Sequence, residues 1–404
     1  MRSATAVRAA GRSALAALGL ALTAGAVPAA GSPTEVPAVV PGQLRVVTQN
    51  QYLGADLGPL LSATGQTEFN AAVVSLLRRI VATDVPARLE RQAAEIAGRA
   101  PDLVGLQEVW HLGCQDIGPP AAGRGCDSPL VRDAFVDHLE LTRKALAAKG
   151  ASYRPAAIIE NFASTSITVP LPGGGHAQGL PFTLDGTHYS LVLAYDSDVI
   201  LAREGVEATP VRLGRCARSG DGCHYLAEVS VTLPAFGGRV TVERGFVAVD
   251  ARVRDRSYRF VDTHLETREP SGVQAEQAIE LVARLALGPS PRGATVLVGD
   301  MNSSPADPPF GGLLPTPYRV FAKAGFTDVW TASGAHAGPG FTCCQRSDLR
   351  NAASRLHERD DLILSRPRPA RVGSVVLLGA KAADKTASGL WPSDHAGVAA
   401  ALRY

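Results

Sequence analysis

Short apolar runs bounded by Gly, Pro, Asn or Asp dominate the chain from residue 44 onward. They are rich in Val, Ile and Leu and shorter than typical helices, which is characteristic of strands buried in a sheet. These runs predict strands over 44–50, 102–109, 153–159, 188–195, 227–233, 245–253, 258–265, 294–300, 361–365, 370–378 and 395–402. The polar residues 254–257 predict a hairpin turn between two of them.

A helical period runs through only a few segments. It predicts helices over 68–82, 86–100, 131–149 and 272–287, whereas 111–130 is predicted as loop. In the second of these helices, Leu89, Ala93 and Ile96 fall on one face, and Pro101 ends it.

Strands outnumber helices in each half of the chain. We therefore predict an α/β fold in which two mixed sheets pack face to face and are covered by helices, rather than one doubly wound parallel sheet.

The N-terminal segment differs from the rest. Three arginines precede an apolar stretch, and small residues follow it, which predicts a secretory signal peptide over 1–30 cleaved between Ala26 and Ala30. An N-terminal anchor is the alternative, but no stop-transfer flank follows. The Pro- and Gly-rich residues 31–43 predict a linker, so we expect a secreted protein with one folded domain over 44–404.

Composition and charge narrow the classes of function. The 404 residues are 46% hydrophobic and 19% charged, which suits a large core. Removing residues 1–30 takes three arginines and no acidic residue from the 40 basic and 38 acidic residues, so the net charge falls from +2 to about −1. This balance does not indicate a broad electrostatic attraction to nucleic acid, although a local basic patch stays possible. No later apolar stretch reaches the roughly 20 residues of a membrane-spanning helix.

The six cysteines suit an exported chain. Cys114 and Cys126 flank a segment rich in Gly and Pro, and Cys216 and Cys223 flank a short polar segment. We predict that each pair forms a disulfide that closes a surface loop.

The remaining two cysteines, Cys343 and Cys344, are adjacent. A bridge between neighbours would be strained, so their state stays open. A zinc site that uses His111 or His224 beside a cysteine of the predicted loops is an alternative, but no paired CxxC spacing supports it.

Polar residues of one kind occur at the ends of several predicted buried strands. They are Asn50, Glu108, His264, Asp300 with Asn302, and Asp394 with His395. Such a set suits the cleavage of a phosphate ester. Carboxylate and amide oxygens bind hard divalent cations such as Mg²⁺ or Mn²⁺, and a neutral histidine takes a proton from water.

At these positions the chain resembles the endonuclease/exonuclease/phosphatase (deoxyribonuclease I-like) superfamily, in the form of its exported bacterial members. The resemblance rests on Asn50, QEV at 107–109, DTHL at 262–265, GDMN at 299–302, DDLIL at 360–364 and SDH at 393–395, in that order. GDMN alone would be weak, but its place between the other motifs makes the set specific.

The resemblance implies a four-layered α/β sandwich with its site at one rim of the paired sheets. It implies a divalent cation, Mg²⁺ or Mn²⁺, held by Asn50, Glu108 and Asp394.

Catalytic roles are implied in the same way. His395 would be the general base that activates water, oriented by Asp361, although the adjacent Asp360 could also face the site. His264 would contact the phosphate or protonate the leaving group. Asp300 would position the nucleophile or a second metal, and Asn302 would hold a phosphate oxygen.

Two departures from the family pattern stand out. Some members carry an acid two residues after the first Asn, but here Tyr52 stands there, and Asp56 is not assigned as a ligand. The mid-chain strand often ends in Ser-Arg, but here it ends in Tyr195 and Asp196, so one route to an arginine that contacts the substrate is absent.

The resemblance thus predicts a secreted, metal-dependent phosphoric ester hydrolase that cleaves phosphodiesters of a nucleic acid or a phospholipid head group, as a nuclease or a sphingomyelinase-like enzyme. A nuclease should present a basic groove, and a lipid enzyme should present an apolar hairpin. An inositol-phosphate phosphomonoesterase and a non-catalytic binding module are the alternatives. A monomer is the default expectation.

Overall fold

The computed structural model describes residues 42–404 except 172–173, 215–219, 269–271 and 335–337. The predicted signal peptide and nearly all of the predicted linker lie outside the described residues. Those that are described belong to one compact unit, Val36–Tyr404. Within the described ranges, no helix combines the length and the hydropathy needed to span a membrane.

The first sheet joins strands from both ends of the described chain. β1 (Gln43–Asn50) runs parallel to β2 (Leu103–Gln107) and antiparallel to β19 (Gly397–Arg403). The strand order is β18-β19-β1-β2-β8-β3, and β4 and β7 also pair with β8. The bounds of the other strands are β3 His111–Asp116, β4 Tyr153–Ala163, β7 Leu180–Thr183, β8 Tyr189–Arg203 and β18 Arg371–Leu378.

The second sheet has the order β10-β13-β14-β15-β17-β16, with β9 beside β13. β14 (Arg256–His264) runs parallel to β15 (Ala294–Asp300), and β17 (Asp361–Arg366) runs antiparallel to β15. The remaining strands of this sheet are β9 Glu207–Pro210, β10 Cys223–His224, β13 Gly245–Val253 and β16 Thr327–Asp328. Two small ribbons consist of β5 Thr168–Pro170 with β6 His176–Gln178, and β11 Val229–Leu233 with β12 Gly238–Val242.

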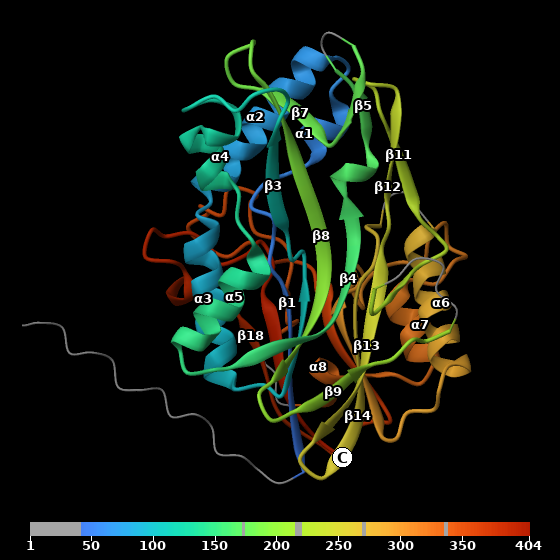
Figure 1. The fold of residues 1–404 in the computed structure, drawn as a ribbon. Helices are drawn as coiled ribbons and strands as arrows, with labels where there is room; N and C mark the ends of the chain where they lie inside the picture. The colour runs from blue at the N-terminus through green and yellow to red at the C-terminus, as the bar shows by residue number, and fades with distance from the viewer. Residues whose placement is uncertain (1–41, 172–173, 215–219, 269–271, 335–337) are drawn as a thin grey trace, which may run out of the picture. The chain divides into compact units, whose positions relative to one another are not determined.

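The two sheets pack face to face and are covered by helices on their outer faces (Figure 1). Val46 and Val296 face the core between the sheets, whereas the next residue of each strand faces the helices. This alternation is the two-residue period of a strand, and it produces four layers. The helices are α1 Gly58–Ser62, α2 Gln66–Ala82, α3 Val85–Arg99, α4 Pro129–Ala134, α5 His138–Ala148, α6 Val273–Leu287, α7 Pro317–Lys323 and α8 Val329–Ala332, with single 3₁₀ turns at Gly125–Asp127, Ser164–Ser166 and Ala382–Asp384.

The predicted fold class is confirmed: the chain is a sandwich of two mixed sheets flanked by helices. The predicted hairpin is also confirmed, since Val253 pairs with Arg256 across the turn between β13 and β14.

Two local predictions were wrong. The predicted loop 111–130 contains β3, because β8 is long enough to pair with β2 near one end and with β3 near the other. The predicted helix 131–149 is divided into α4 and α5, because Phe135 has extended backbone and Asp137 caps a new helix by accepting a hydrogen bond from the Glu140 N–H.

Candidate active site

Strand register brings the predicted residues to one rim of the paired sheets. In the second sheet, His264 pairs with Asp300, and Asp300 pairs with Asp361. In the first sheet, Asn50 pairs with the last residue of β2, so Glu108 follows directly beside it. The segment that carries Asp394 and His395 enters β19, which is the other neighbour of β1. The ends of neighbouring strands therefore place all these side chains together.

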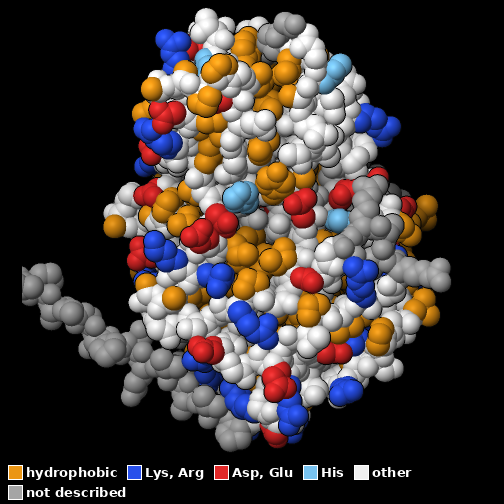
Figure 2. All heavy atoms as spheres, viewed as in Figure 1, with side chains coloured by type: hydrophobic (Ala, Val, Ile, Leu, Met, Phe, Trp, Pro, Cys, Tyr) orange, Lys and Arg blue, Asp and Glu red, His pale blue; other side chains and the backbone are white. Residues whose placement is uncertain are grey.

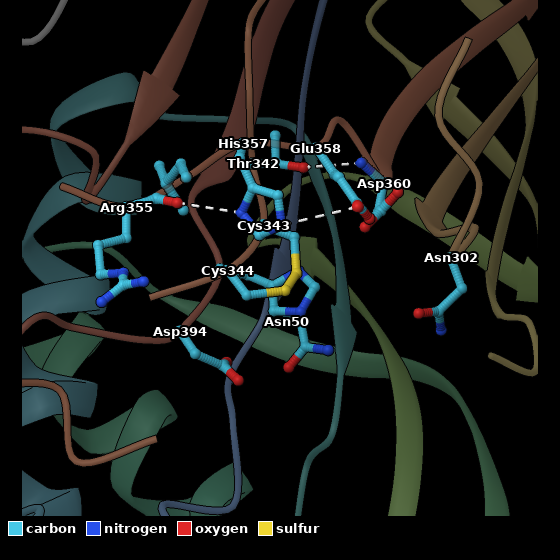
Figure 3. Close-up of a disulfide and its surroundings, with 12 residues drawn as sticks. Asn50, Asn302, Thr342, Cys343, Cys344, Arg355, His357, Glu358, Asp360 and Asp394 are labelled. Carbon is cyan, nitrogen blue, oxygen red and sulfur yellow. Dashed lines mark hydrogen bonds and ion pairs between the residues drawn. A yellow bond between two sulfur atoms is a disulfide. The ribbon is translucent and has the colours of Figure 1, made fainter. Parts of the chain in front are cut away.

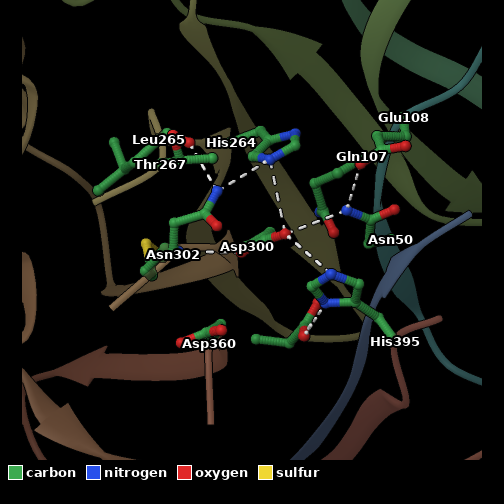
Figure 4. A network of polar contacts seen from close by, with 12 residues as sticks. Asn50, Gln107, Glu108, His264, Leu265, Thr267, Asp300, Asn302, Asp360 and His395 are labelled. Carbon is green, nitrogen blue, oxygen red and sulfur yellow. Dashed lines mark hydrogen bonds and ion pairs between the residues drawn. The ribbon is translucent and has the colours of Figure 1, made fainter. Parts of the chain in front are cut away.

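Hydrogen bonds from Asn50 connect the two sheets (Figure 4). Its Nδ2 donates to Glu108 Oε1 at 3.0 Å and to Asp300 Oδ2 at 3.0 Å. Its Oδ1 accepts from the Tyr52 N–H at 3.0 Å, and the Leu53 N–H donates to Glu108 Oε2 at 3.2 Å. The predicted convergence of these residues on one site is therefore observed.

Three residues at this rim have left-handed backbone. Tyr52, Glu108 and Asn302 have φ values of 62°, 53° and 45°, although none is glycine. Each lies one or two residues beyond the end of a buried strand. Backbone of this kind is costly for residues with a side chain, and it concentrates at functional sites. Here it turns the chain so that Glu108 and Asn302 point back over the strand ends.

His395 and Asp361 form a close pair. His395 Nδ1 donates to Asp361 Oδ2 at 2.7 Å, and His395 Nε2 lies 3.7 Å from Asp300 Oδ2. Both carboxylates are buried. Burial opposes the charged form of His395, but the charges of Asp361 and Asp300 outweigh it and hold the pKa of His395 well above its usual range. The pair leaves Nε2 as the nitrogen that faces the site.

Asp361, and not Asp360, is the partner of His395. The imidazole is hydrogen-bonded to the Asp361 carboxylate, whereas burial and the nearby charge of Asp300 raise the pKa of Asp360 to about 8. Burial raises the pKa of Asp361 to about 6 while His395 opposes the shift. The choice that the sequence left open is thus decided by geometry.

His264 lies in a different environment. Arg244 Nη1 donates to His264 Nδ1 at 2.9 Å, and the other ring nitrogen lies 3.2 Å from Asn302 Nδ2 and 3.5 Å from Asp300 Oδ2. Burial and the positive charge of Arg244 lower the pKa of His264 to about 4. His264 is therefore neutral at pH 7, and its Nδ1 is an acceptor, which places its proton on Nε2.

The GDMN motif is a rigid turn that follows β15. The Asn302 N–H donates to Asp300 Oδ1 at 2.9 Å, and Asn302 Nδ2 donates to the Leu265 carbonyl at 3.0 Å. Although burial acts in the opposite direction, His395 and His264 hold the pKa of Asp300 below its usual value. Asp300 is thus a carboxylate between two imidazoles.

Asp394 and Glu108 are half-buried and line one cavity. Burial raises the pKa of Asp394 to about 7, and the charge of Glu108 adds to the shift although His395 opposes it. Ser393 Oγ donates to the Asn50 carbonyl at 2.9 Å, which ties this segment to β1. Two half-buried carboxylates beside an amide oxygen form a donor set that suits a hard divalent cation.

Arg88 connects the segment after Asn50 to the segment before Asp394. It is fully buried in α3, and its guanidinium donates to the carbonyls of Gln51, Tyr52 and Pro392 at 3.1 Å each. Burial lowers the pKa of Arg88 to about 10, so it stays charged at neutral pH. One side chain thereby fixes the segment after Asn50 against the segment before Asp394.

The adjacent cysteines border the site (Figure 3). Cys343 and Cys344 are bonded to each other, which answers the question that the sequence left open. Thr342, the residue before this pair, joins their segment to two segments of the site. The Ala396 N–H donates to the Thr342 carbonyl at 2.7 Å, and the Asp361 N–H donates to Thr342 Oγ1 at 3.0 Å.

The predicted Cys114–Cys126 disulfide is present. This bond removes Cys114 as a thiolate ligand for the alternative zinc site. Cys223 is also disulfide-bonded, but Cys216 lies outside the described residues, so the predicted pairing of these two stays a prediction.

Sequence reasoning missed Arg244. This residue lies between β12 and β13, where its guanidinium contacts His264 and lies 3.8 Å from Glu266 Oε2. Asp196, at which the expected arginine is absent, faces the same cavity. An arginine is thus supplied by the connection between β12 and β13. The sequence holds no signal for this arginine, because its role depends on the contact with His264 from a distant segment.

Comparison with known sequences identifies the family of this chain. The sequence profile of the Endonuclease/Exonuclease/phosphatase family matches residues 69–395. The chain belongs to the endonuclease/exonuclease/phosphatase family. Members of this family are typically hydrolases of phosphoesters, and they generally use divalent metals. No curated protein sequence matches the chain.

Several solved structures of family members are similar to this chain. An endonuclease/exonuclease/phosphatase from Beutenbergia cavernae is 19% identical, covers 89% of this chain and 71% of its own, and has a TM-score of 0.45. A mannosyl-6-phosphatase of Bacteroides thetaiotaomicron is 14% identical over 89% of this chain and 100% of its own, with a TM-score of 0.47. D. rerio TDP2 complexed with a single-strand DNA product is 14% identical over 90% of this chain and 99% of its own, with a TM-score of 0.45.

We predict that replacing Arg244 by glutamine lowers kcat/KM for a phosphoester substrate by about 10- to 100-fold, because a charge-assisted hydrogen bond is worth about 1.5–3 kcal/mol. Steady-state kinetics would measure the change. Arg239→Gln, an exposed position on β12, is the matched control. Equal losses in the two variants would contradict a role for Arg244 at the site.

Proposed function

We propose that this protein is an exported phosphodiesterase that requires a divalent metal and hydrolyses its substrate with an activated water. The observation that carries the proposal is the convergence of Asn50, Glu108 and Asp394 with the His395–Asp361 pair at one rim. The predicted signal peptide and the disulfide between Cys114 and Cys126 support export, because disulfides persist in oxidising compartments.

The residues at the rim fit a cation. Asn50, Glu108 and Asp394 would hold Mg²⁺ or Mn²⁺, because an amide and two half-buried carboxylates offer the oxygen ligands that these cations prefer. When bound, the cation would screen the charge of the phosphate and polarise its phosphorus–oxygen bonds.

The remaining residues have distinct tasks. His395 Nε2 takes a proton from water while Asp361 holds the opposite ring nitrogen. Neutral His264 directs its Nε2–H toward the phosphate or the leaving-group oxygen, and Asn302 holds a phosphate oxygen. Asp300 positions the nucleophile between the two imidazoles.

A diester is favoured over a monoester by the charge of the site. Among the described residues that line the cavity, Arg244 is the sole Lys or Arg. A phosphomonoester carries nearly two negative charges at pH 7, so it would call for more cationic partners. On the face in Figure 2, Lys and Arg are interspersed with Asp and Glu, which also gives little support to a basic nucleic-acid groove.

Hydrolysis of a panel of substrates tests this proposal. Plasmid DNA, RNA, sphingomyelin, bis(p-nitrophenyl) phosphate and the monoester p-nitrophenyl phosphate would each be incubated with Mg²⁺, with Mn²⁺ and with chelator. We expect at least one phosphodiester to be cleaved with either cation and none with chelator. Full activity in chelator, or cleavage of phosphomonoesters alone, would overturn the proposal.

A further inference from the structure

A large apolar cavity opens directly from the candidate active site. Its volume is about 650 Å³, and its walls come from α1, α2, β3, β7, β8 and the β11–β12 ribbon. At one end it is lined by Glu108, Asp394 and Arg244, and elsewhere hydrophobic side chains predominate. The groups that would act on a phosphate therefore lie at the polar end of an otherwise apolar cavity.

The apolar wall is built from core residues. Phe162 is half-buried where it lines the cavity, and it packs against a core cluster that contains the buried Phe69, Leu77 and Val192. Protein interiors are close-packed and rarely keep voids larger than a water molecule, because lost contacts destabilise the fold. A cavity of this size within a hydrophobic cluster, continuous with the site, is consistent with a space that a ligand fills.

The β11–β12 ribbon closes one side of the cavity. Val229, Val231 and Val242 line it, whereas Ser230 and Thr241 lie on the opposite face, where their hydroxyls are 2.9 Å apart. Among the described strands, β11 and β12 pair only with each other. The apolar face of this alternating ribbon therefore lines the cavity and not a larger sheet.

The surface above this region is also apolar. In Figure 2, hydrophobic side chains gather in the upper part of the view, around the position of β7 and β8 in Figure 1, whereas charged side chains are more frequent below. A nucleotide base placed in the apolar part of the cavity would bury its hydrogen-bonding edges against hydrocarbon side chains, which is costly. A hydrocarbon chain has no such groups.

We propose that this cavity binds the hydrocarbon chain of the substrate, so that the natural substrate is a single-chain alkyl or acyl phosphoester whose phosphate lies at Glu108 and Asp394. This inference rests on the proposed function for the position of the phosphate. At about 30 Å³ per methylene, close to the volume share of a water molecule, the cavity has room for a chain of about a dozen carbons or more. Trp110 and the ribbon residues Val229 and Val231 would line the hydrocarbon chain.

Binding of alkyl phosphates tests this inference without turnover. The dissociation constants of methyl, butyl, octyl and dodecyl phosphate, all kept monomeric, would be measured by calorimetry on the full chain with Mg²⁺. We expect the dissociation constant to fall by about fourfold for each added methylene until the cavity is full, which is the gain from burying a methylene. Equal affinity for methyl and dodecyl phosphate would overturn the inference.

Two neighbouring substitutions on β11 provide a matched pair. Val231→Trp fills the cavity from the half-buried ribbon, whereas Thr232→Trp adds the same side chain on the exposed opposite face. We expect Val231→Trp to remove the dependence on chain length and Thr232→Trp to keep it. If both variants behave alike, the cavity does not hold the chain. If Val231→Trp fails to fold, the chain-length series of the unmodified protein still decides.

Turnover separates this inference from the proposed function. Alkyl p-nitrophenyl phosphodiesters with the same set of chains would be assayed with Mg²⁺. Chain-dependent binding without hydrolysis would refute the phosphodiesterase but leave the cavity assignment intact. Hydrolysis with a KM that does not change with chain length would refute the cavity assignment and leave the phosphodiesterase.

Discussion

Replacing His395 by alanine is expected to lower kcat for a phosphodiester by about 1,000-fold, because a positioned general base contributes about 10²–10⁴-fold to such reactions. His395 Nε2 is the ring nitrogen that faces the site, and Asp361 holds the other nitrogen at 2.7 Å. Single-turnover kinetics with saturating substrate and Mg²⁺ would measure the loss. His176→Ala, on exposed β6, is the control and should keep the activity of the unmodified protein.

The same pair predicts the pH dependence. A general base must be neutral, so activity rises as the pH increases through the pKa of His395, which Asp361 and Asp300 hold above its usual range against the opposing effect of burial. Asp361→Asn removes one of these charges, lowers that pKa and moves the rise to lower pH, while the maximal rate falls. A rise that stays at the same pH in Asp361→Asn would argue against His395 as the base.

Replacing Gly299 by alanine is expected to lower the free energy of unfolding by about 2–4 kcal/mol, through backbone strain and overpacking. Gly299 has φ 143°, and a Cβ added there would overlap the carbonyl oxygen of Thr263 on the paired strand β14. Neither strand can move freely, because both are packed on two sides. One face of each strand packs in the core between the sheets, and the other face packs in the core beneath α6. Urea unfolding would measure the loss.

A second glycine makes the control for this experiment. Gly98 lies exposed in helix α3, and nothing lies within 4 Å of a Cβ added to it. Gly98→Ala is expected to raise the free energy of unfolding by about 0.5–1 kcal/mol, because alanine favours the helix. If the two alanine substitutions change the free energy of unfolding in opposite directions, the available space and the backbone angle decide the effect. An unchanged stability of Gly299→Ala would contradict the described packing of β14 on β15.

Much of the fold could be predicted because hydrophobic runs specify strands directly. Runs such as 294–300 and 258–265 are buried on both faces, so composition alone marks them. β3 could not be predicted in this way, because its polar and glycine residues form a strand only through pairing with β8. Tertiary pairing there overrides local preference.

The site could be predicted to the extent that it lies at strand ends. Asn50, Glu108 and Asp300 share that placement, and strand register alone brings them together. Arg244 and the apolar cavity could not be found from the chain, because they depend on which side chains from distant elements face one space. The choice between Asp360 and Asp361 likewise needed the geometry of β17.

Manganese binding tests whether Asn50, Glu108 and Asp394 form a metal centre. Electron paramagnetic resonance would measure the affinity of Mn²⁺ for the unmodified protein, for Glu108→Gln and for Glu140→Gln, an exposed position on α5. We predict one tight site in the unmodified protein that weakens by about 100-fold or more in Glu108→Gln, since a charged ligand is lost, and that is unchanged in Glu140→Gln. Equal Mn²⁺ affinity in all three proteins would contradict a metal centre built by Asn50, Glu108 and Asp394.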